Sequence, residues 1–328
     1  MIHDALFYEN VNDKIHCFLC PHNCVIGHDS YGLCTVRGNK GGKLKTINYG
    51  EVASVNQDPI EKKPLYHFKP SSMVLSVGSF GCNFACAFCQ NYSISQNKAK
   101  SEYVSPHKLV EICSSLTNNV GIAFTYNEPT IWYEYVYETS KILKKENPNK
   151  SIVLVTDGYI QKKPLEKLLP YVDAMNIDLK SFNDEYYKNI CRGRLQPVLE
   201  TIALASKHCH VEITTLMVNG LNDSMDEIEK ISSFIANIDK NIPLHLSRYF
   251  PTYKMKQPPT DINVMLSANK KAMEYLNHVY LGNVPNLDNS TYCPECKELL
   301  IERSAMNSKL YVDNNSCPKC GFKLNIVF

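Results

Sequence analysis

The feature that most constrains the fold is a series of short apolar segments that alternate with helical patterns. Each segment is bounded by polar or turn residues, as expected for strands buried on both faces of a sheet. The expected strands are Met73–Val77, Gly121–Thr125, Ile152–Thr156, Val172–Ile177, Val211–Met217, Ile242–Leu246 and His278–Leu281. Repeated strand–helix units predict a parallel sheet. The predicted fold class is α/β, a partial or full (β/α) barrel, with a doubly wound open sheet as the alternative.

Two of the intervening helices have clear N-terminal signals. Ser105 is an N-cap followed by Pro106 at the first helical position. Ser224 precedes Glu227 by three residues, which is the capping-box pattern. These signals predict helices that begin near residues 106 and 225.

Three closely spaced cysteines, Cys82, Cys86 and Cys89, follow the first expected strand. Their spacing is C-x3-C-x2-C, and a cubane iron–sulfur cluster normally takes four thiolates. Three thiolates can hold three irons and leave the fourth iron open for a small molecule. Parallel α/β folds place chemistry at the carboxyl ends of strands, so this position favours a catalytic cluster. A structural zinc knot or an unrelated trio of buried thiols is the alternative.

Two further cysteine groups lie toward the ends of the chain. Two C-P-x-C knuckles predict a C-terminal zinc ribbon, with a rubredoxin-like iron as the alternative, at Cys293, Cys296, Cys317 and Cys320. An N-terminal set could ligate an auxiliary iron–sulfur cluster or a zinc ion, and its glycine-rich flanks favour zinc: Cys17, Cys20, Cys24 and Cys34. The three remaining thiols are expected to be buried and inert.

The cysteine groups divide the 328 residues into three expected parts. Residues 1–70 form an irregular metal-binding segment, 71–285 the (β/α) barrel, and 286–328 the zinc ribbon. Fourteen cysteines without an export signal indicate metal binding in a cytoplasmic protein. No uncharged apolar stretch is long enough to span a membrane. The net charge of +2 argues against binding to nucleic acid or membranes.

Polar side chains follow several of the expected strands, where they could contact a bound ligand. Asn127 and Glu128 follow the second strand, and Glu128 could accept from a ligand ammonium or cap the next helix. Thr156 ends the third strand. Asp178 and Lys180 follow the fourth, either as ligand contacts or as an ion pair.

Two further candidates lie within strands rather than after them. Glu212 is costly to bury unless it is paired, so it is either a pocket residue or part of a structural ion pair. His245 is either a ligand contact or a satisfied core histidine.

The cysteine loop resembles the signature loop of radical S-adenosylmethionine (SAM) enzymes. More narrowly, the chain resembles radical SAM enzymes of the AmmeMemoRadiSam system, which are relatives of the pyruvate formate-lyase activating enzyme. The matching text is Cys17 to Cys24, Asp58 to Phe68, Gly81 to Asn91, Tyr126 to Thr130, and the C-P-x-C tail. The superfamily often has Gly-Gly-Glu-Pro where this chain has Tyr-Asn-Glu-Pro. The Glu-Pro pair that includes Glu128 is therefore kept, whereas Asn127 takes the place of a glycine.

The resemblance implies a [4Fe-4S] cluster that binds and reductively cleaves SAM to a 5′-deoxyadenosyl radical, which abstracts hydrogen from an unidentified protein or small molecule. It implies that Glu128, Asn127, Asp178, Lys180 and His245 lie near SAM, and we expect Thr156 and Glu212 to contribute to the same cofactor site. It also implies a reductant such as flavodoxin or ferredoxin, and Memo-like or AMMECR-like partner proteins. A glycyl-radical enzyme activase is one alternative, and an iron–sulfur or zinc protein for partner binding or redox sensing is the non-enzymatic one.

Overall fold

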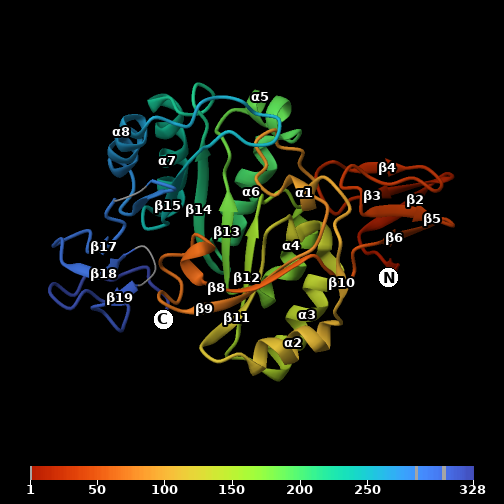
Figure 1. The fold of residues 1–328 in the computed structure, drawn as a ribbon, viewed down its shortest axis with the longest axis horizontal. Coiled ribbons are helices and arrows are strands. Elements are labelled where there is room, and N and C mark those ends of the chain that lie inside the picture. The colour runs from red at the N-terminus through yellow and green to blue at the C-terminus, as the bar shows by residue number, and fades with distance from the viewer. Residues whose placement is uncertain (1, 285–286, 305–307) are drawn as a thin grey trace.

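The computed structural model describes residues 2–284, 287–304 and 308–328 (Figure 1). A central sheet lies between a group of small N-terminal strands and a small C-terminal sheet. In Figure 1 the N-terminal strands are red at the right and the C-terminal sheet is blue at the left.

Eight described strands form the central sheet in the order β16-β15-β14-β13-β12-β11-β9-β8. The edge strand β8 (Ser54–Pro59) is antiparallel to β9. All other pairs are parallel, between β9 (Met73–Gly78), β11 (Asn119–Phe124), β12 (Ser151–Thr156), β13 (Ala174–Asp178), β14 (His210–Met217), β15 (Leu244–Arg248) and β16 (Val279–Gly282). All seven expected strands are therefore present, with shifts of one or two residues at their ends.

The spatial order of these strands follows their order in the chain. A doubly wound sheet reverses direction at a switch point, and this sheet has no reversal among its described strands. The edges β8 and β16 do not pair with each other, so hydrogen bonds do not close the described sheet into a complete barrel. The α/β prediction is confirmed, and a closed barrel is not.

Helices connect the parallel strands, and neighbouring helices pack against each other in pairs. Examples are α2 (Pro106–Ser115) with α3 (Tyr133–Glu146) and α7 (Met225–Asp239) with α8 (Ile262–Met273). Ser105 accepts a hydrogen bond from the Lys108 amide (3.2 Å) at the start of α2, and Ser224 accepts from the Glu227 amide (3.2 Å) at the start of α7. Glu227 does not complete the capping box, because its carboxylate accepts from Ser181 and the Phe182 amide.

The principal helices are α2 (Pro106–Ser115), α3 (Tyr133–Glu146), α4 (Lys162–Leu168), α6 (Leu195–Ala205), α7 (Met225–Asp239) and α8 (Ile262–Met273). Shorter helices are α1 (Tyr92–Ser95), α5 (Asp184–Tyr186), three 3-10 turns at 60–62, 129–132 and 169–171, and a π-helical turn at 187–191.

The N-terminal segment forms small antiparallel sheets whose apolar side chains join the core of the central sheet. One sheet contains β1 (His3–Asp4), β6 (Lys43–Thr46) and β5 (Arg37–Lys40). Another contains β2 (Tyr8–Val11), β3 (Lys14–Cys17) and β4 (Cys24–Ile26), and a two-stranded ribbon pairs β7 (Glu51–Val52) with β10 (Glu102–Tyr103). Ile15, Leu19 and Leu44 are buried in the same cluster as the side chains of β9 to β15.

The C-terminal sheet has its own small core, formed by Leu300, Ile301, Val312, Leu324 and Ile326. Its strands are β17 (Thr291–Tyr292), β18 (Leu299–Arg303) and β19 (Ser308–Leu310). The expected boundary between residues 285 and 286 lies outside the described residues.

The end of the chain pairs with the loop that connects β8 to β9. The Lys69 amide donates to the Val327 carbonyl (2.6 Å), and the Val327 amide donates to the His67 carbonyl (2.8 Å). The Arg303 guanidinium lies 4.3 Å from the centre of the Tyr66 ring. These contacts hold the C-terminal sheet against the central domain.

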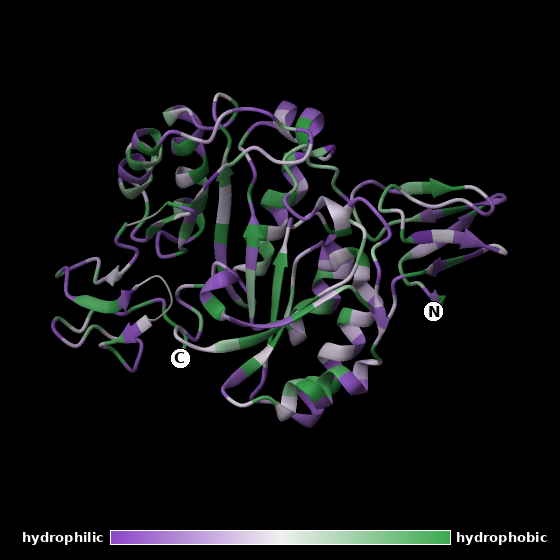
Figure 2. Cartoon of the chain, viewed as in Figure 1, coloured by the Kyte–Doolittle hydropathy of each residue, from purple (hydrophilic) through white to green (hydrophobic). Residues whose placement is uncertain are grey.

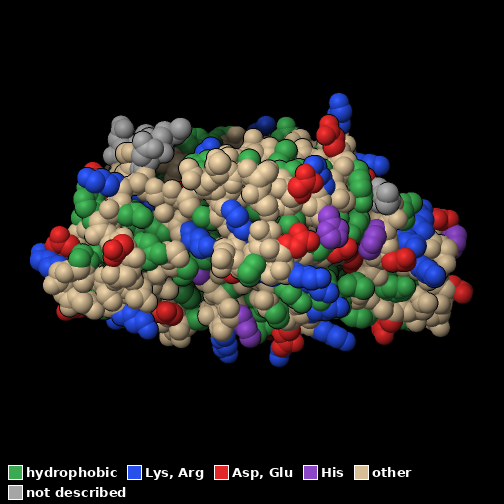
Figure 3. Space-filling model, turned by 90° about the horizontal axis from the view of Figure 1, so that it is seen from below, with side chains coloured by type: hydrophobic (Ala, Val, Ile, Leu, Met, Phe, Trp, Pro, Cys, Tyr) green, Lys and Arg blue, Asp and Glu red, His purple; other side chains and the backbone are tan. Residues whose placement is uncertain are grey.

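Hydropathy is greatest along the parallel strands (Figure 2). Ile122, Phe124, Ile152, Ile177 and Ile213 are fully buried, as expected for strands covered on both faces. On the face shown in Figure 3, acidic and basic side chains are interspersed, in keeping with the near-neutral net charge. None of the described helices combines the length and the apolar character that a membrane span needs.

Candidate active site at the carboxyl ends of the parallel strands

A cavity of about 370 Å³ opens at the carboxyl ends of the parallel strands. Eight of the ten residues predicted to bind the cluster or SAM line it: Cys82, Cys86, Cys89, Asn127, Glu128, Thr156, Asp178 and Lys180. They come from the loops after β9 and β11 and from the carboxyl ends of β12 and β13, because the ends of neighbouring parallel strands meet at one edge of a sheet.

The three cysteines lie on one loop between β9 and α1. Burial raises the pKa of Cys82 and also that of Cys89, whose sulfur lies 3.1 Å from the Ser95 hydroxyl. A hydrogen bond with the Cys191 thiol lowers the pKa of Cys86. Cys191, expected to be inert, is thus buried beside a candidate cluster ligand at the end of the π-helical turn.

Asparagine side chains hold this loop in place. Asn127 accepts from the Ser79 amide (2.9 Å) and donates to the Gly81 carbonyl (2.9 Å). Asn83 donates to the Tyr159 carbonyl (2.8 Å). Asn127 therefore positions the residue before Cys82, in addition to lining the cavity.

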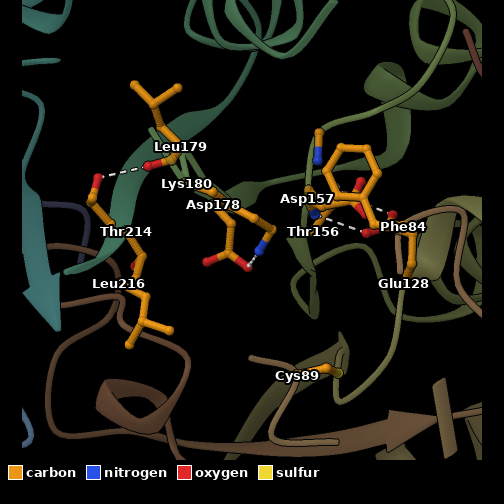
Figure 4. Close-up of polar contacts among 12 residues, drawn as sticks. Phe84, Cys89, Glu128, Thr156, Asp157, Asp178, Leu179, Lys180, Thr214 and Leu216 are labelled. Carbon is orange, nitrogen blue, oxygen red and sulfur yellow. Dashed lines mark hydrogen bonds and ion pairs between the residues drawn. The ribbon is translucent and has the colours of Figure 1, made fainter. Parts of the chain in front are cut away.

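Glu128 is buried and fully hydrogen-bonded. One carboxylate oxygen accepts from the Thr130 amide (2.8 Å) and the Thr156 hydroxyl (2.7 Å), and the other accepts from the Asp157 amide (2.8 Å). The helix cap considered as an alternative is therefore present, and it joins the ends of β11 and β12 (Figure 4). The same side chain still lines the cavity.

Asp157 is a cavity residue that the sequence did not single out. Its Oδ1 accepts from the Tyr159 amide (2.9 Å), and its Oδ2 lies 3.8 Å from the Cys82 sulfur. Burial and the nearby Glu128 carboxylate raise the pKa of Asp157 well above its usual value.

Asp178 and Lys180 form an ion pair with a 2.9 Å separation between Nζ and Oδ2 (Figure 4). Burial alone would lower the pKa of Lys180, but Asp178 and the neighbouring thiols raise it well above its usual value. Asp178 and Lys180 are therefore paired with each other and also line the cavity.

Lys63 and Tyr126, at the rim of the cavity, are joined by Asp58, and none of the three was predicted to have a role. Asp58 accepts from Lys63 (2.8 Å) and from the Tyr126 hydroxyl (2.8 Å). Despite partial burial, hydrogen bonds from Lys63 and Tyr126 lower the pKa of Asp58 to about 2. Tyr126 closely follows β11, so its position at the cavity could have been predicted from the sequence. Lys62 and Lys63 reach the cavity through the long connection between β8 and β9, which the sequence pattern does not reveal.

Glu212 and His245 do not line this cavity. Glu212 is fully buried and accepts from the Tyr66 and His67 amides (3.0 and 2.7 Å) and lies at hydrogen-bond distance from His210 and His245 (3.0 and 2.7 Å). Burial raises the pKa of Glu212, but the two histidines hold it well below its usual value. The structural pairing considered for Glu212 is present, and contact of either residue with SAM stays a prediction.

The N-terminal cysteines surround a small enclosed cavity that is also lined by Arg37 and Ile131. Cys17 and Cys24 face each other on β3 and β4. Burial raises the pKa of Cys34 to about 11, so a bound metal would be needed to favour its thiolate.

The C-terminal cysteines form a compact group whose sulfur atoms all lie within 4.8 Å of one another. Cys293 and Cys320 are 3.7 Å apart, and Cys296 and Cys317 are 3.6 Å apart. Tetrahedral zinc with Zn–S bonds of about 2.3 Å requires sulfur–sulfur separations of about 3.8 Å. The geometry fits a four-thiolate metal site.

Comparisons with known proteins agree with the position of the cysteine loop. A family model for the radical SAM superfamily matches residues 76–235. An uncharacterized protein of Methanocaldococcus jannaschii is 44% identical over 336 aligned residues, with 99% of each chain covered. A putative glycyl-radical enzyme activating enzyme of the same organism is 29% identical over 207 residues, covering 61% of this chain and 77% of its own.

Among solved structures, Streptococcus suis SuiB bound to S-adenosylmethionine has a TM-score of 0.50 at 12% identity and supports the fold alone. The match covers 64% of this chain and 51% of SuiB. The assignment to a family rests on the family model and on the relative that is 44% identical. The chain belongs to the radical SAM superfamily, and its radical SAM domain is homologous to glycyl-radical enzyme activating enzymes.

Proposed function

We propose that this protein binds a [4Fe-4S] cluster through Cys82, Cys86 and Cys89, cleaves SAM reductively, and abstracts hydrogen from a protein or small-molecule substrate. The observation that carries the proposal is the convergence of these three thiols with polar strand-end side chains on one cavity. Its volume of about 370 Å³ lies within the usual range of small-molecule sites, about 300–1,000 Å³.

The residues fit such a cluster in number and chemistry. Three thiolates leave one iron for an external ligand, and all three cysteine side chains line the same cavity. When bound, the cluster would supply one electron to the sulfonium of SAM.

The chain's own residues would orient SAM and limit access of water. Asn127 and Glu128 fix the loop and the ends of β11 and β12. Lys180 is a largely buried cation beside the cavity with 12% of its side chain exposed, suited to a carboxylate or phosphate-like oxygen, and Asp178 holds its ammonium in place. Phe84 and Phe88 provide apolar walls.

The test is anaerobic reconstitution with iron, sulfide, SAM and a reductant, followed by measurement of 5′-deoxyadenosine. We expect the product from the wild type and from Cys209→Ser, a thiol outside the cavity. We expect none from Cys86→Ala. A wild-type protein with a fully loaded cluster that forms no 5′-deoxyadenosine would reject the proposal in favour of a sensing or binding role.

A second candidate within this chemistry is activation of a glycyl-radical enzyme. The homology with a putative activating enzyme and the Asp178–Lys180 pair favour it. Incubation with a glycyl-radical enzyme, SAM and reductant would give the doublet EPR signal of a glycyl radical. Absence of that signal, with 5′-deoxyadenosine formed, would point to a different substrate.

The expected partners belong to the same proposal. A flavodoxin or ferredoxin would supply the electron, Memo-like or AMMECR-like proteins are candidate substrates or partners, and zinc is the proposed metal of the C-terminal group. Co-purification and metal analysis of the full-length chain test these three points directly.

A further inference from the structure

The cysteine loop of the candidate active site has two faces. One face lines the cavity at the carboxyl ends of the parallel strands, where SAM binds in the proposed function. The other face is covered by the π-helical turn Tyr187–Cys191, which follows α5 at the same ends of the strands (Figure 1). Because a bound SAM molecule would occupy the cavity side, the covered face leaves a second approach to the loop free.

The cover over this second face is thin. The Ala85 amide donates to the Cys191 carbonyl (2.9 Å). Gly193 packs so closely on the Phe84 ring that an added Cβ would lie 2.2 Å from it. Arg192, between these two contact residues in the sequence, is exposed to solvent. A single peptide bond on either side therefore joins the exposed Arg192 to residues that touch the cysteine loop.

The outer surface of the cover is an open hollow of about 780 Å³ with a basic lining. Lys188, Arg192 and Arg194 line it and are exposed, and no Asp or Glu among the described residues lines it. His22 also lines the hollow, but burial lowers its pKa, so His22 adds no charge at neutral pH. A concentration of positive charge of this kind attracts an acidic partner and speeds its association.

The three cations differ in how free they are to meet a partner. Lys188 is paired with the exposed Glu185 (3.1 Å). Arg194 donates to the Pro21 carbonyl (2.8 Å), which holds one end of its guanidinium. The Arg192 guanidinium has neither a hydrogen bond nor an ion pair within the part of the chain that the structure describes. Arg192 is therefore the cation most available to a partner in this hollow.

The backbone of Arg192 gives an independent indication of a role. Its φ of 62° and ψ of 43° are left-handed, a conformation that is uncommon for a residue with a long side chain. Residues held in such conformations cluster at functional sites, and π-helical turns are also frequent there. The chain thus places an unpaired cation at a position where glycine or asparagine would be less strained.

We propose that the hollow lined by Lys188, Arg192 and Arg194 is the docking surface for the acidic carrier protein that supplies the electron. Flavodoxins and ferredoxins have acidic surfaces that complement this lining. One electron passes from the reduced carrier to the oxidised cluster across the thin cover, and no atom is transferred. The inference rests on the proposed function, because it requires a redox-active cluster on the cysteine loop.

Stopped-flow reduction of the reconstituted full chain tests this surface, with cluster absorbance as the signal. One series uses reduced flavodoxin, and the other uses reduced methyl viologen, a small cation that gains nothing from a basic surface. Arg192→Asn removes the charge and tolerates the left-handed backbone, so we expect it to lower the second-order rate constant with flavodoxin roughly threefold to tenfold. Arg192→Lys should retain most of the wild-type rate. Neither variant should react more slowly than the wild type with methyl viologen.

A control variant and the dependence on salt complete the test. Lys230→Gln, at a half-exposed position on α7, should leave both rates unchanged. Added salt should slow the reaction of the wild type with flavodoxin, and it should slow that of Arg192→Asn less steeply. Equal flavodoxin rates in the wild type and Arg192→Asn at low salt would overturn the docking surface. Equal losses with both reductants would also overturn it, because they would indicate damage to the cysteine loop.

Failure of the proposed function gives a different result. A wild-type cluster that both reductants reduce, but that forms no 5′-deoxyadenosine from SAM, would reject the proposed function. The reduction rates of the variants would still decide whether the carrier docks in the hollow.

Discussion

Replacement of Glu212 by Gln tests whether this carboxylate is a structural anchor or a ligand contact. Each of its oxygens has two hydrogen-bond partners: Tyr66 N and His245 on one, His67 N and His210 on the other. Gln turns one acceptor oxygen into a donor NH₂ that faces two of these groups. The histidine can change tautomer to accept, but the backbone N–H cannot.

The magnitude follows from this geometry. An unpaired buried donor costs about 1–3 kcal/mol, and a hydrogen bond to a charged carboxylate is worth about 1.5–3 kcal/mol. We therefore expect Glu212→Gln to lower the free energy of unfolding by about 3–5 kcal/mol. Glu166→Gln, at an exposed site 3.7 Å from Lys162, should change it by less than about 1 kcal/mol.

The assay combines urea unfolding, monitored by circular dichroism, with SAM binding to the folded variants by calorimetry. SAM affinity should change by less than about twofold, roughly 0.4 kcal/mol. A large loss of affinity with unchanged stability would refute the structural interpretation and restore Glu212 to the SAM site.

Three further predictions concern other parts of the molecule. Burial lowers the pKa of His278 to about 4 from 6.5, so the unfolded chain binds a proton at this histidine before the folded chain does as the pH falls. The free energy of unfolding should therefore drop by up to about 3 kcal/mol between pH 6.5 and 4. The pH dependence of the urea midpoint should flatten in His278→Asn. Gly193→Ala places a Cβ 2.2 Å from the buried Phe84 ring, and this overpacking should lower the free energy of unfolding by about 1–3 kcal/mol and reduce iron retention. Gly27→Ala, where the nearest atom to the added Cβ is 3.9 Å away, should change neither quantity. Removal of the proposed C-terminal zinc with a chelator should expose residues 291–328 to limited proteolysis, because we expect the small core there to depend on the four-thiolate site.

Each of these three predictions has a clear contrary result. A pH slope that is the same in His278→Asn and in the wild type would show that His278 does not contribute to acid unfolding. Unchanged stability and iron content in Gly193→Ala would show that Phe84 has room to move. Resistance of the metal-free C-terminal sheet to protease would show that its apolar core is sufficient.

The parallel strands could be predicted because apolar runs such as Ile152–Thr156 are buried on both faces and leave a strong signal in the sequence. β8 could not be predicted in this way. Ser54–Pro59 is polar and partly exposed, and it forms a strand because β9 offers a free edge. The small N-terminal strands likewise depend on pairing partners rather than on an apolar pattern.

The candidate site was predictable where residues follow a strand and less so where they lie within one. Asp178 and Lys180 reach the cavity because β13 ends there. The alternation of side chains along β14 places Glu212 and Thr214 on the same face of the sheet, but it does not tell how far each lies from the cavity at the carboxyl end of the strand. Only Thr214, two residues nearer the carboxyl end, lines the cavity, whereas Glu212 lies below it among the histidines.

The pairing of Val327 with the Tyr66–Lys69 loop has a consequence for the order of biosynthesis. This loop is translated early and leads from Lys62 and Lys63 at the cavity rim into β9. One side is fastened by Glu212, but the other needs residues that are translated much later, in a small sheet for which we propose a bound metal. Supply of that metal would therefore set when a newly made molecule completes the rim of its cavity.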